Sequence, residues 1–138
     1  DLVLSTLHTN DTSQAVSRIL DSFPAANQPQ IRQQLSLALL AIVAQQLVPT
    51  ANGSRYPAVE ILMGSPAVRN LIRENKTFRI NSAIQTGAKL GMRLMDDSLF
   101  NLWRRELCTK EECLERSVYP DEFAARVAKA ERGVFDDE

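Results

Sequence analysis

The residue best suited to chemistry in this sequence is His8, the only histidine in the chain. It follows a short apolar run, Val3 to Leu7, of the kind that fills a buried strand. Ligands of open α/β sheets bind at the ends of such strands, and this position favours a catalytic role. The alternative is a surface or helix-capping histidine beside Asn10 and Asp11.

A second candidate is the octet, which we define as residues Ala67 to Glu74. At helical spacing its apolar and polar residues separate onto two sides, so it has one face to bury and one polar face. The apolar side holds Val68, Leu71 and Ile72, and the polar side holds Arg69, Asn70, Arg73 and Glu74. A solvated helix face is the simple interpretation, and a contact surface is the other.

The usual equipment for phosphoryl transfer is missing from the sequence. The P-loop pattern G-x-x-x-x-G-K-[ST] has no match, and Gly87 to Gly91 predicts a helix end followed by a turn. No acidic residue ends an apolar strand where it would hold Mg²⁺ or orient water. Cys108 and Cys113 lie five apart, which suits neither a zinc site nor a disulfide framework. We expect reduced thiols, a cytoplasmic location, no metal site and no ATP hydrolysis by this chain alone.

The totals limit the class of protein. With 138 residues, 44% of them hydrophobic, and a net charge of −1, the chain is one domain or a domain fragment with an appended helical piece. No apolar run is long enough for a membrane span, so we expect no membrane insertion. Basic residues exceed acidic ones by three in 1–108, whereas acidic residues exceed basic ones by four in 109–138. This pattern has no strongly basic patch and argues against a nucleic-acid partner.

The early elements that must position His8 mix strands and helices. We predict a strand at 3–7 and then a helix capped by residues 10–12 and ended by Pro24. A second helix should begin at 27–30, with an apolar stripe that continues to Ile42 and is buried at that end.

A hairpin should follow, with strands around 46–48 and 58–62 that flank Asn52-Gly53. Ser65 is suited to cap the octet helix, and Pro66 to open it. Two helices are expected at 78–86 and 92–107. A third should begin at the capping box of residues 109–112, and a last one should include Phe123 and Val127 and end before Gly133. Four larger side chains are expected in the core rather than in a cofactor pocket: Met92, Met95, Phe100 and Trp103.

Two of these segments resemble motifs of one superfamily. Leu2 to Thr9 resembles the His box of secretion and pilus ATPases, G-H-L-V-x-x-T-L-H-T, which Thr6, His8 and Thr9 match residue by residue. Asp1 stands where that pattern has an earlier histidine. The octet differs at one position from the AIRNLIRE motif of PilT-type retraction ATPases, the motors of twitching motility.

Further similar segments follow in the family's order at 18–24, 44–47, 60–66 and 82–87. Pilus-assembly and type II secretion ATPases usually insert a four-cysteine module where this chain has a short turn from Pro49 to Pro57. This difference favours the retraction side of the superfamily.

The resemblance implies an α/β to mostly α fold: residues 1–64 as the C-terminal part of a RecA-like ATPase core and 65–138 as a helical C-terminal subdomain. It implies a hexameric ring ATPase in which ATP and Mg²⁺ are held by sequence upstream of Asp1. His8 would lie beside the γ-phosphate as a catalytic residue, with Thr6 and Thr9. The octet residues Arg69, Asn70, Arg73 and Glu74 would serve coupling or subunit contacts. The parent protein would act in the cytoplasm, peripheral to the inner membrane at the pilus base, on an inner-membrane platform protein.

Two other functions stay open from the sequence. One is a pilus-assembly or type II secretion ATPase of the same superfamily. The other is a stand-alone helical interaction module that docks on the pilus machinery. If residues 3–7 are a strand cut from a larger sheet, its edge is unpaired, so we expect association between copies or a rearranged start.

Overall fold

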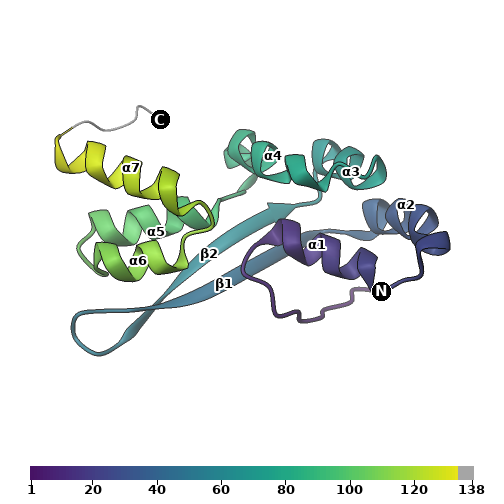
Figure 1. The fold of residues 1–138 in the computed structure, drawn as a ribbon. Helices are drawn as coiled ribbons and strands as arrows, with labels where there is room; N and C mark the ends of the chain where they lie inside the picture. The colour runs from purple at the N-terminus through teal and green to yellow at the C-terminus, as the bar shows by residue number, and fades with distance from the viewer. Residues whose placement is uncertain (134–138) are drawn as a thin grey trace. The chain divides into compact units, whose positions relative to one another are not determined.

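The computed structural model describes residues 1–133, which are mainly helical (Figure 1). In chain order the elements are α1 (Thr12–Asp21), η1 (Ala25–Asn27), α2 (Gln28–Ala38), β1 (Ala41–Pro49), β2 (Arg55–Met63), α3 (Pro66–Arg73), η2 (Thr77–Arg79), α4 (Ile80–Thr86), η3 (Ala88–Leu90), α5 (Met95–Arg104), α6 (Lys110–Arg116) and α7 (Pro120–Glu131). The two strands form one sheet. The predicted fold class, α/β to mostly α with a hairpin and a helical C-terminal part, is confirmed as a helix-rich fold with a small two-stranded sheet.

The chain divides into two compact units. Unit 1 combines residues 1–44 with 60–94, and unit 2 combines 45–59 with the residues from 95 onward. Both strands of the hairpin therefore contribute residues to both units. The expected division of the chain between residues 64 and 65 stays a prediction.

The predicted strand at 3–7 is wrong. Residues 1–9 have no helical or strand structure, and the side chains of Val3 and Leu4 are 81% and 87% exposed. A strand needs neighbouring strands that pair with its N–H and C=O groups and cover its apolar side chains. Within residues 1–133 the only sheet is the β1-β2 hairpin, which does not include this segment.

The first helix begins and ends as predicted. Asp11 is its N-cap, and its side chain accepts a hydrogen bond of 2.8 Å from the Gln14 backbone N–H. The helix α1 stops at Asp21, ahead of Pro24. Val16 and Leu20, one turn apart, bury the apolar side.

The second helix begins where predicted but ends at Ala38, so the expected helical continuation to Ile42 is wrong. The stripe itself packs as expected, because Ile31, Leu35, Leu39 and Ile42 are partly buried against the core of unit 1. The backbone becomes extended at Leu39, and β1 begins at Ala41. Leu40 and Val43 are each 61% exposed. β-branched residues favour a strand, and pairing with β2 outweighs the helical continuation that the apolar run alone indicates.

The hairpin is confirmed, with strands of nine residues each, longer than predicted. Its turn contains Asn52-Gly53, and Gly53 has a φ of 81°, a conformation that glycine adopts without strain. The Thr50 N–H donates to the Ser54 carbonyl at 2.9 Å and closes the loop.

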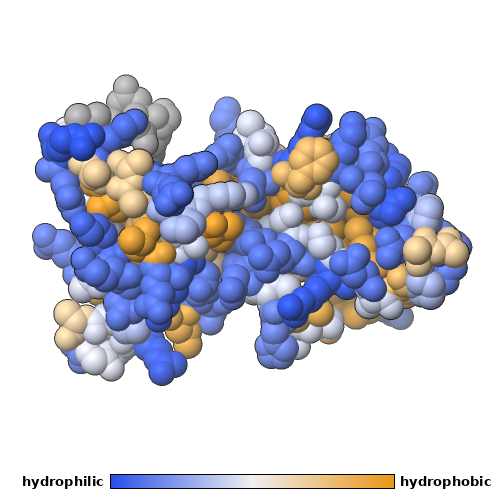
Figure 2. All heavy atoms as spheres, viewed as in Figure 1, coloured by the Kyte–Doolittle hydropathy of each residue, from blue (hydrophilic) through white to orange (hydrophobic). Residues whose placement is uncertain are grey.

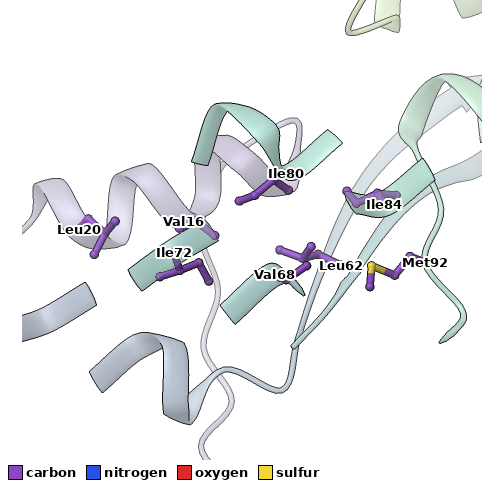
Figure 3. Packing of buried hydrophobic residues seen from close by; sticks show 8 residues of the cluster. All are labelled: Val16, Leu20, Leu62, Val68, Ile72, Ile80, Ile84 and Met92. Atoms are coloured by element: carbon purple, nitrogen blue, oxygen red, sulfur yellow. The ribbon is translucent and has the colours of Figure 1, made fainter. Parts of the chain in front are cut away.

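The core of unit 1 is a cluster of buried side chains from α1, β2, α3 and α4 and from the segment after η3 (Figure 3). Its members are Val16, Leu20, Leu62, Val68, Ile72, Ile80, Ile84 and Met92. The octet helix therefore inserts its apolar side into the same core as α1.

The predicted helix at 92–107 is shorter in the structure because its first residues pair with a strand instead. The Arg93 backbone exchanges two hydrogen bonds with Ile61, at 2.8 and 3.1 Å, so the segment there is extended. Met92 belongs to the core of unit 1, whereas α5 starts at Met95.

Unit 2 contains the last three helices, as predicted. Thr109 caps α6 by accepting a hydrogen bond of 3.2 Å from the Glu112 N–H, and Phe123 and Val127 bury one side of α7. Met95 and Phe100 are buried and Trp103 is half-buried, which agrees with a core role.

Hydrophilic side chains cover most of the face drawn in Figure 2, and apolar ones show between them in separate groups. Across residues 1–133, no helix has the length and apolar character that crossing a membrane requires.

Candidate functional site

The His8 segment, residues Thr6 to Thr9, is a mostly exposed stretch without regular secondary structure that leads into α1. The side chains of Thr6 and His8 are exposed, and Thr9 is half-buried. Arg18, in the second turn of α1, reaches back and donates a hydrogen bond of 2.9 Å from its guanidinium to the His8 carbonyl. The backbone of His8 is thus tied to α1, while its imidazole remains accessible to a ligand.

The first turn of α1 is held by Glu60, a residue that sequence reasoning did not select. One carboxylate oxygen of Glu60, Oε2, accepts hydrogen bonds from the Thr12 backbone N–H at 2.6 Å and from the Thr12 hydroxyl at 2.8 Å. Glu60 is 1% exposed and Thr12 is fully buried. A carboxylate in this place is stabilised by the free N–H groups and the positive end of the helix dipole.

A signal for Glu60 is present in the sequence. Ala58, Glu60 and Leu62 occupy alternate positions of β2 and are all buried. Period-2 alternation therefore puts a carboxylate among inward-facing residues, where an ionised group needs a partner.

The octet forms the helix α3, and both features predicted for the start of this helix are present. Ser65 is the N-cap, accepting a hydrogen bond of 3.3 Å from the Val68 N–H, and Pro66 is the first helical residue. Val68 and Ile72 are completely buried. The polar face of the octet is thereby fixed in orientation by the packing of the opposite face.

The four polar residues of the octet are not equivalent. Arg69 is half-buried, and its Nε donates a hydrogen bond of 2.8 Å to the Gly64 carbonyl. Asn70, Arg73 and Glu74 are exposed. Arg73 donates to the Asn70 side-chain oxygen at 2.8 Å, and Glu74 forms a salt bridge of 3.3 Å with an exposed lysine. Of the four polar residues, these three have exposed side chains.

Gly64, where β2 leads into α3, lies in close contact with another part of the backbone. A Cβ at this position would be 2.1 Å from the Leu39 carbonyl oxygen, and the Gly64 N–H donates to the Leu40 carbonyl at 2.8 Å. Only glycine fits this approach.

The two sets of predicted site residues lie in the same unit without direct hydrogen bonds between them. Within residues 1–133, no hydrogen bond or salt bridge joins Thr6, His8 or Thr9 to the octet's polar side chains, and no group of three His, Cys, Asp or Glu side chains could hold a metal ion. Both sets contact α1, the His8 segment through Arg18 and the octet through the core that it shares with Val16.

Two other features do not form a site. Gly87 to Gly91 is a helix end followed by a 3-10 turn, as predicted, with Gly91 at a φ of 88°. Cys108 and Cys113 are both free and buried. Burial raises the pKa of the Cys113 thiol to about 12 and also raises that of Cys108, so neither supplies a thiolate near neutral pH.

Comparisons with known proteins agree with the two motifs. Residues 1–60 match the family described as type II/IV secretion system protein. The chain is 40% identical over 122 residues to the type IV pilus retraction ATPase PilT of Pseudomonas aeruginosa, which covers 88% of this chain and 36% of that protein. It is 46% identical over 117 residues to a twitching motility protein of Neisseria gonorrhoeae, covering 84% and 31%.

A solved structure gives the same result. The chain matches the crystal structure of the pilus retraction motor PilT with bound ADP at a TM-score of 0.75 and 39% identity, covering 84% of this chain and 32% of that one. The chain spans about a third of the length of these relatives. From motifs, sequence identity and fold together, it belongs to the type II/IV secretion system protein family, in its PilT-type branch.

Proposed function

We propose that this chain is part of a ring-shaped ATPase that powers retraction of type IV pili. The observation that carries the proposal is the octet helix. Its apolar side is locked into the core of unit 1, while Asn70, Arg73 and Glu74 remain exposed. A motif that differs at one position from that of the retraction ATPases is thus present as a rigid, accessible surface.

Hydrolysis of ATP in the parent protein would use the His8 segment. The exposed imidazole of His8 and the hydroxyls of Thr6 and Thr9 suit hydrogen bonds to phosphate oxygens, and a donor beside the γ-phosphate stabilises charge that develops during transfer. Because the sequence has no P-loop, the phosphates and Mg²⁺ would be held by other parts of the parent protein. The ADP bound in the solved structure of the PilT motor supports a nucleotide as ligand of the whole protein.

The exposed part of the octet would serve force transmission rather than catalysis. In this proposal the parent protein is a homohexamer in the cytoplasm, peripheral to the inner membrane at the pilus base. The octet's exposed side chains contact either a neighbouring subunit or the inner-membrane platform protein. Arg69 supports this surface from below through Gly64, so its role is to hold the helix.

The test uses the intact protein that carries this chain. His8→Ala should lower the kcat of ATP hydrolysis about 100-fold, the loss expected when one donor to a transition-state oxyanion is removed. Arg73→Ala should leave kcat unchanged and stop pilus retraction. Arg132→Ala, which removes an exposed arginine at the end of α7, is the matched control and should change neither. A His8→Ala protein with unchanged kcat, or an Arg73→Ala strain that retracts normally, contradicts the assignment.

A second function, that of a pilus-assembly or type II secretion ATPase, is favoured by one observation. The family match covers residues 1–60, which include the His8 segment shared by the whole superfamily but not the octet. Deletion of the parent gene separates the two functions. Loss of a retraction motor leaves pili that extend but do not retract, whereas loss of an assembly motor leaves none.

A further inference from the structure

We infer that Thr12 and Glu60 form a joint through which the His8 segment acts on the octet, an inference that rests on the proposed function. Neither residue belongs to a motif that assigns it a role. Both are positioning residues, because the contact between them lies between the nucleotide-facing segment and the force-transmitting helix.

The first link connects the His8 segment to α1. Only three residues separate His8 from Thr12, and one of them, Asp11, caps the helix with its side chain and is 7% exposed. Arg18 ties the His8 carbonyl to the second turn of the same helix. The segment is therefore held at two points of α1, so a displacement of the His8 backbone moves that helix.

The second link connects α1 to β2. Thr12 places both its backbone N–H and its hydroxyl on a single oxygen of Glu60, and both residues are shielded from solvent. Water cannot replace either hydrogen bond at such a site, and separation would leave a buried carboxylate without these donors. The contact therefore transmits a displacement instead of yielding to it.

The third link reaches the octet from both sides. Glu60 precedes the octet in the sequence, and Thr77 follows it. Ser13, next to Thr12, donates a hydrogen bond of 3.1 Å from its hydroxyl to the Thr77 carbonyl. The first turn of α1 thus contacts β2, which precedes α3 in the sequence, and η2, which follows it.

Packing in the core also links α1 to α3. Val16 of α1 lies in the same buried cluster as Val68 and Ile72 of the octet helix (Figure 3). Densely packed side chains do not deform continuously, so a shift of α1 must be accompanied by a shift of α3. The result is a route from His8 to the octet that uses one helix, one buried carboxylate and one core.

A purely structural role for the contact makes a different prediction from a joint. If Thr12 and Glu60 only stabilise α1, weakening the contact raises hydrogen exchange in the octet equally in every nucleotide state. If they form a joint, weakening the contact removes the difference in octet hydrogen exchange between the nucleotide states. The ratio of exchange rates with a non-hydrolysable ATP analogue and with ADP is therefore the readout, measured on peptides from 66–77 in the intact protein.

The decisive variant is Thr12→Val, which removes the hydroxyl and keeps the shape of the side chain. In the unmodified protein we expect the exchange ratio to differ from one by at least about fivefold, the lower range of allosteric coupling. Thr12→Val should reduce that ratio to near one without changing the affinity for the ATP analogue, and Thr12→Ser should restore it. Thr86→Val is the control, since it removes a hydroxyl of the same unit whose hydrogen bonds go to the Ser82 and Ala83 carbonyls of its own helix and not to α1.

Other outcomes overturn the inference in distinguishable ways. If the exchange ratio is unchanged in Thr12→Val, the joint is overturned. It is also overturned if the unmodified protein hydrolyses ATP but shows the same octet exchange with the ATP analogue and with ADP. In that last case the proposed motor stands. An intact protein that binds no ATP removes the proposed function itself. If Thr12→Val does not fold, Ser13→Ala is the second test, because it breaks only the contact from α1 to Thr77. A lowered exchange ratio in this variant supports the coupling of α1 to α3, and an unchanged ratio overturns it.

Discussion

The His8 segment and the octet helix lie in the same unit and carry the two clearest motifs, yet they are held in place differently. The octet helix contains its own hydrogen bonds, has a serine cap, and buries Val68 and Ile72 completely. The His8 segment has no regular structure, the apolar residues before it are exposed, and a hydrogen bond from Arg18 ties its backbone to α1. The comparison teaches that a motif can be rigid by itself or can take its position from a distant element.

The largest expected effect on stability comes from truncating an apolar side chain in each of the two regions. Ile72→Ala should lower the free energy of unfolding by about 2–5 kcal/mol, because it leaves a cavity at a fully buried site. Leu4→Ala should change it by less than about 0.5 kcal/mol, because that side chain is 87% exposed. Urea unfolding of this chain followed by circular dichroism measures both. Similar losses for the two variants would show that residues 3–7 are packed in solution.

A second test concerns the junction that leads into the octet. Gly64→Ala should cost about 1–3 kcal/mol or more, since its Cβ would overlap the Leu39 carbonyl oxygen, a rigid backbone atom. Gly87→Ala is the comparison, because the nearest atoms to its Cβ belong to the flexible Met92 side chain. Thermal unfolding should show the greater loss for Gly64→Ala. The reverse order would mean that the Leu39 backbone can move aside.

The helix caps next to the two motifs can be compared directly. Ser65→Ala before α3 and Asp11→Ala before α1 should each cost about 1 kcal/mol, the usual value of a lost N-cap. The aspartate should matter more, because its negative charge also favours the helix N-terminus. Amide exchange should rise in the first turn of the helix that has lost its cap and remain unchanged in the other. A rise in both helices would show that the two first turns open together.

The smallest expected losses of stability distinguish two arginines on the octet's polar face. Arg69→Ala removes a half-buried hydrogen bond to Gly64 and should cost about 1 kcal/mol. Arg73→Ala removes only an exposed bond to Asn70 and should cost less than about 0.5 kcal/mol. Chemical denaturation of both variants measures the difference. Equal costs would place Arg73 in the support of the helix and not on its contact surface.

The local elements of this fold follow from neighbouring residues. Asp11, Ser65 and Thr109 cap the helices that they were predicted to cap, and Asn52-Gly53 forms the turn of the hairpin. Each of these features depends on hydrogen bonds or backbone preferences within a few residues, so a short window of sequence contains the necessary information.

Predictions that needed a distant partner succeeded less often. Residues 3–7 have the composition of a strand but no neighbouring strand in residues 1–133, and the apolar run after α2 became β1 because β2 pairs with it. Glu60 looks like an ordinary polar strand residue until Thr12 is placed against it. The family resemblance did select His8 and the octet, but it did not indicate how they are connected.

Spacing and residue type alone thus specify an octet helix with one buried and one polar side, the hairpin turn and the helix caps. Tertiary structure decides that Arg69 supports the helix while Arg73 is exposed, and that Glu60 holds the first turn of α1 across 48 residues of sequence. The physical reason is the range of the interactions. A cap or an amphipathic period is a property of one segment, whereas a buried carboxylate is stable only where a distant part of the chain supplies its donors.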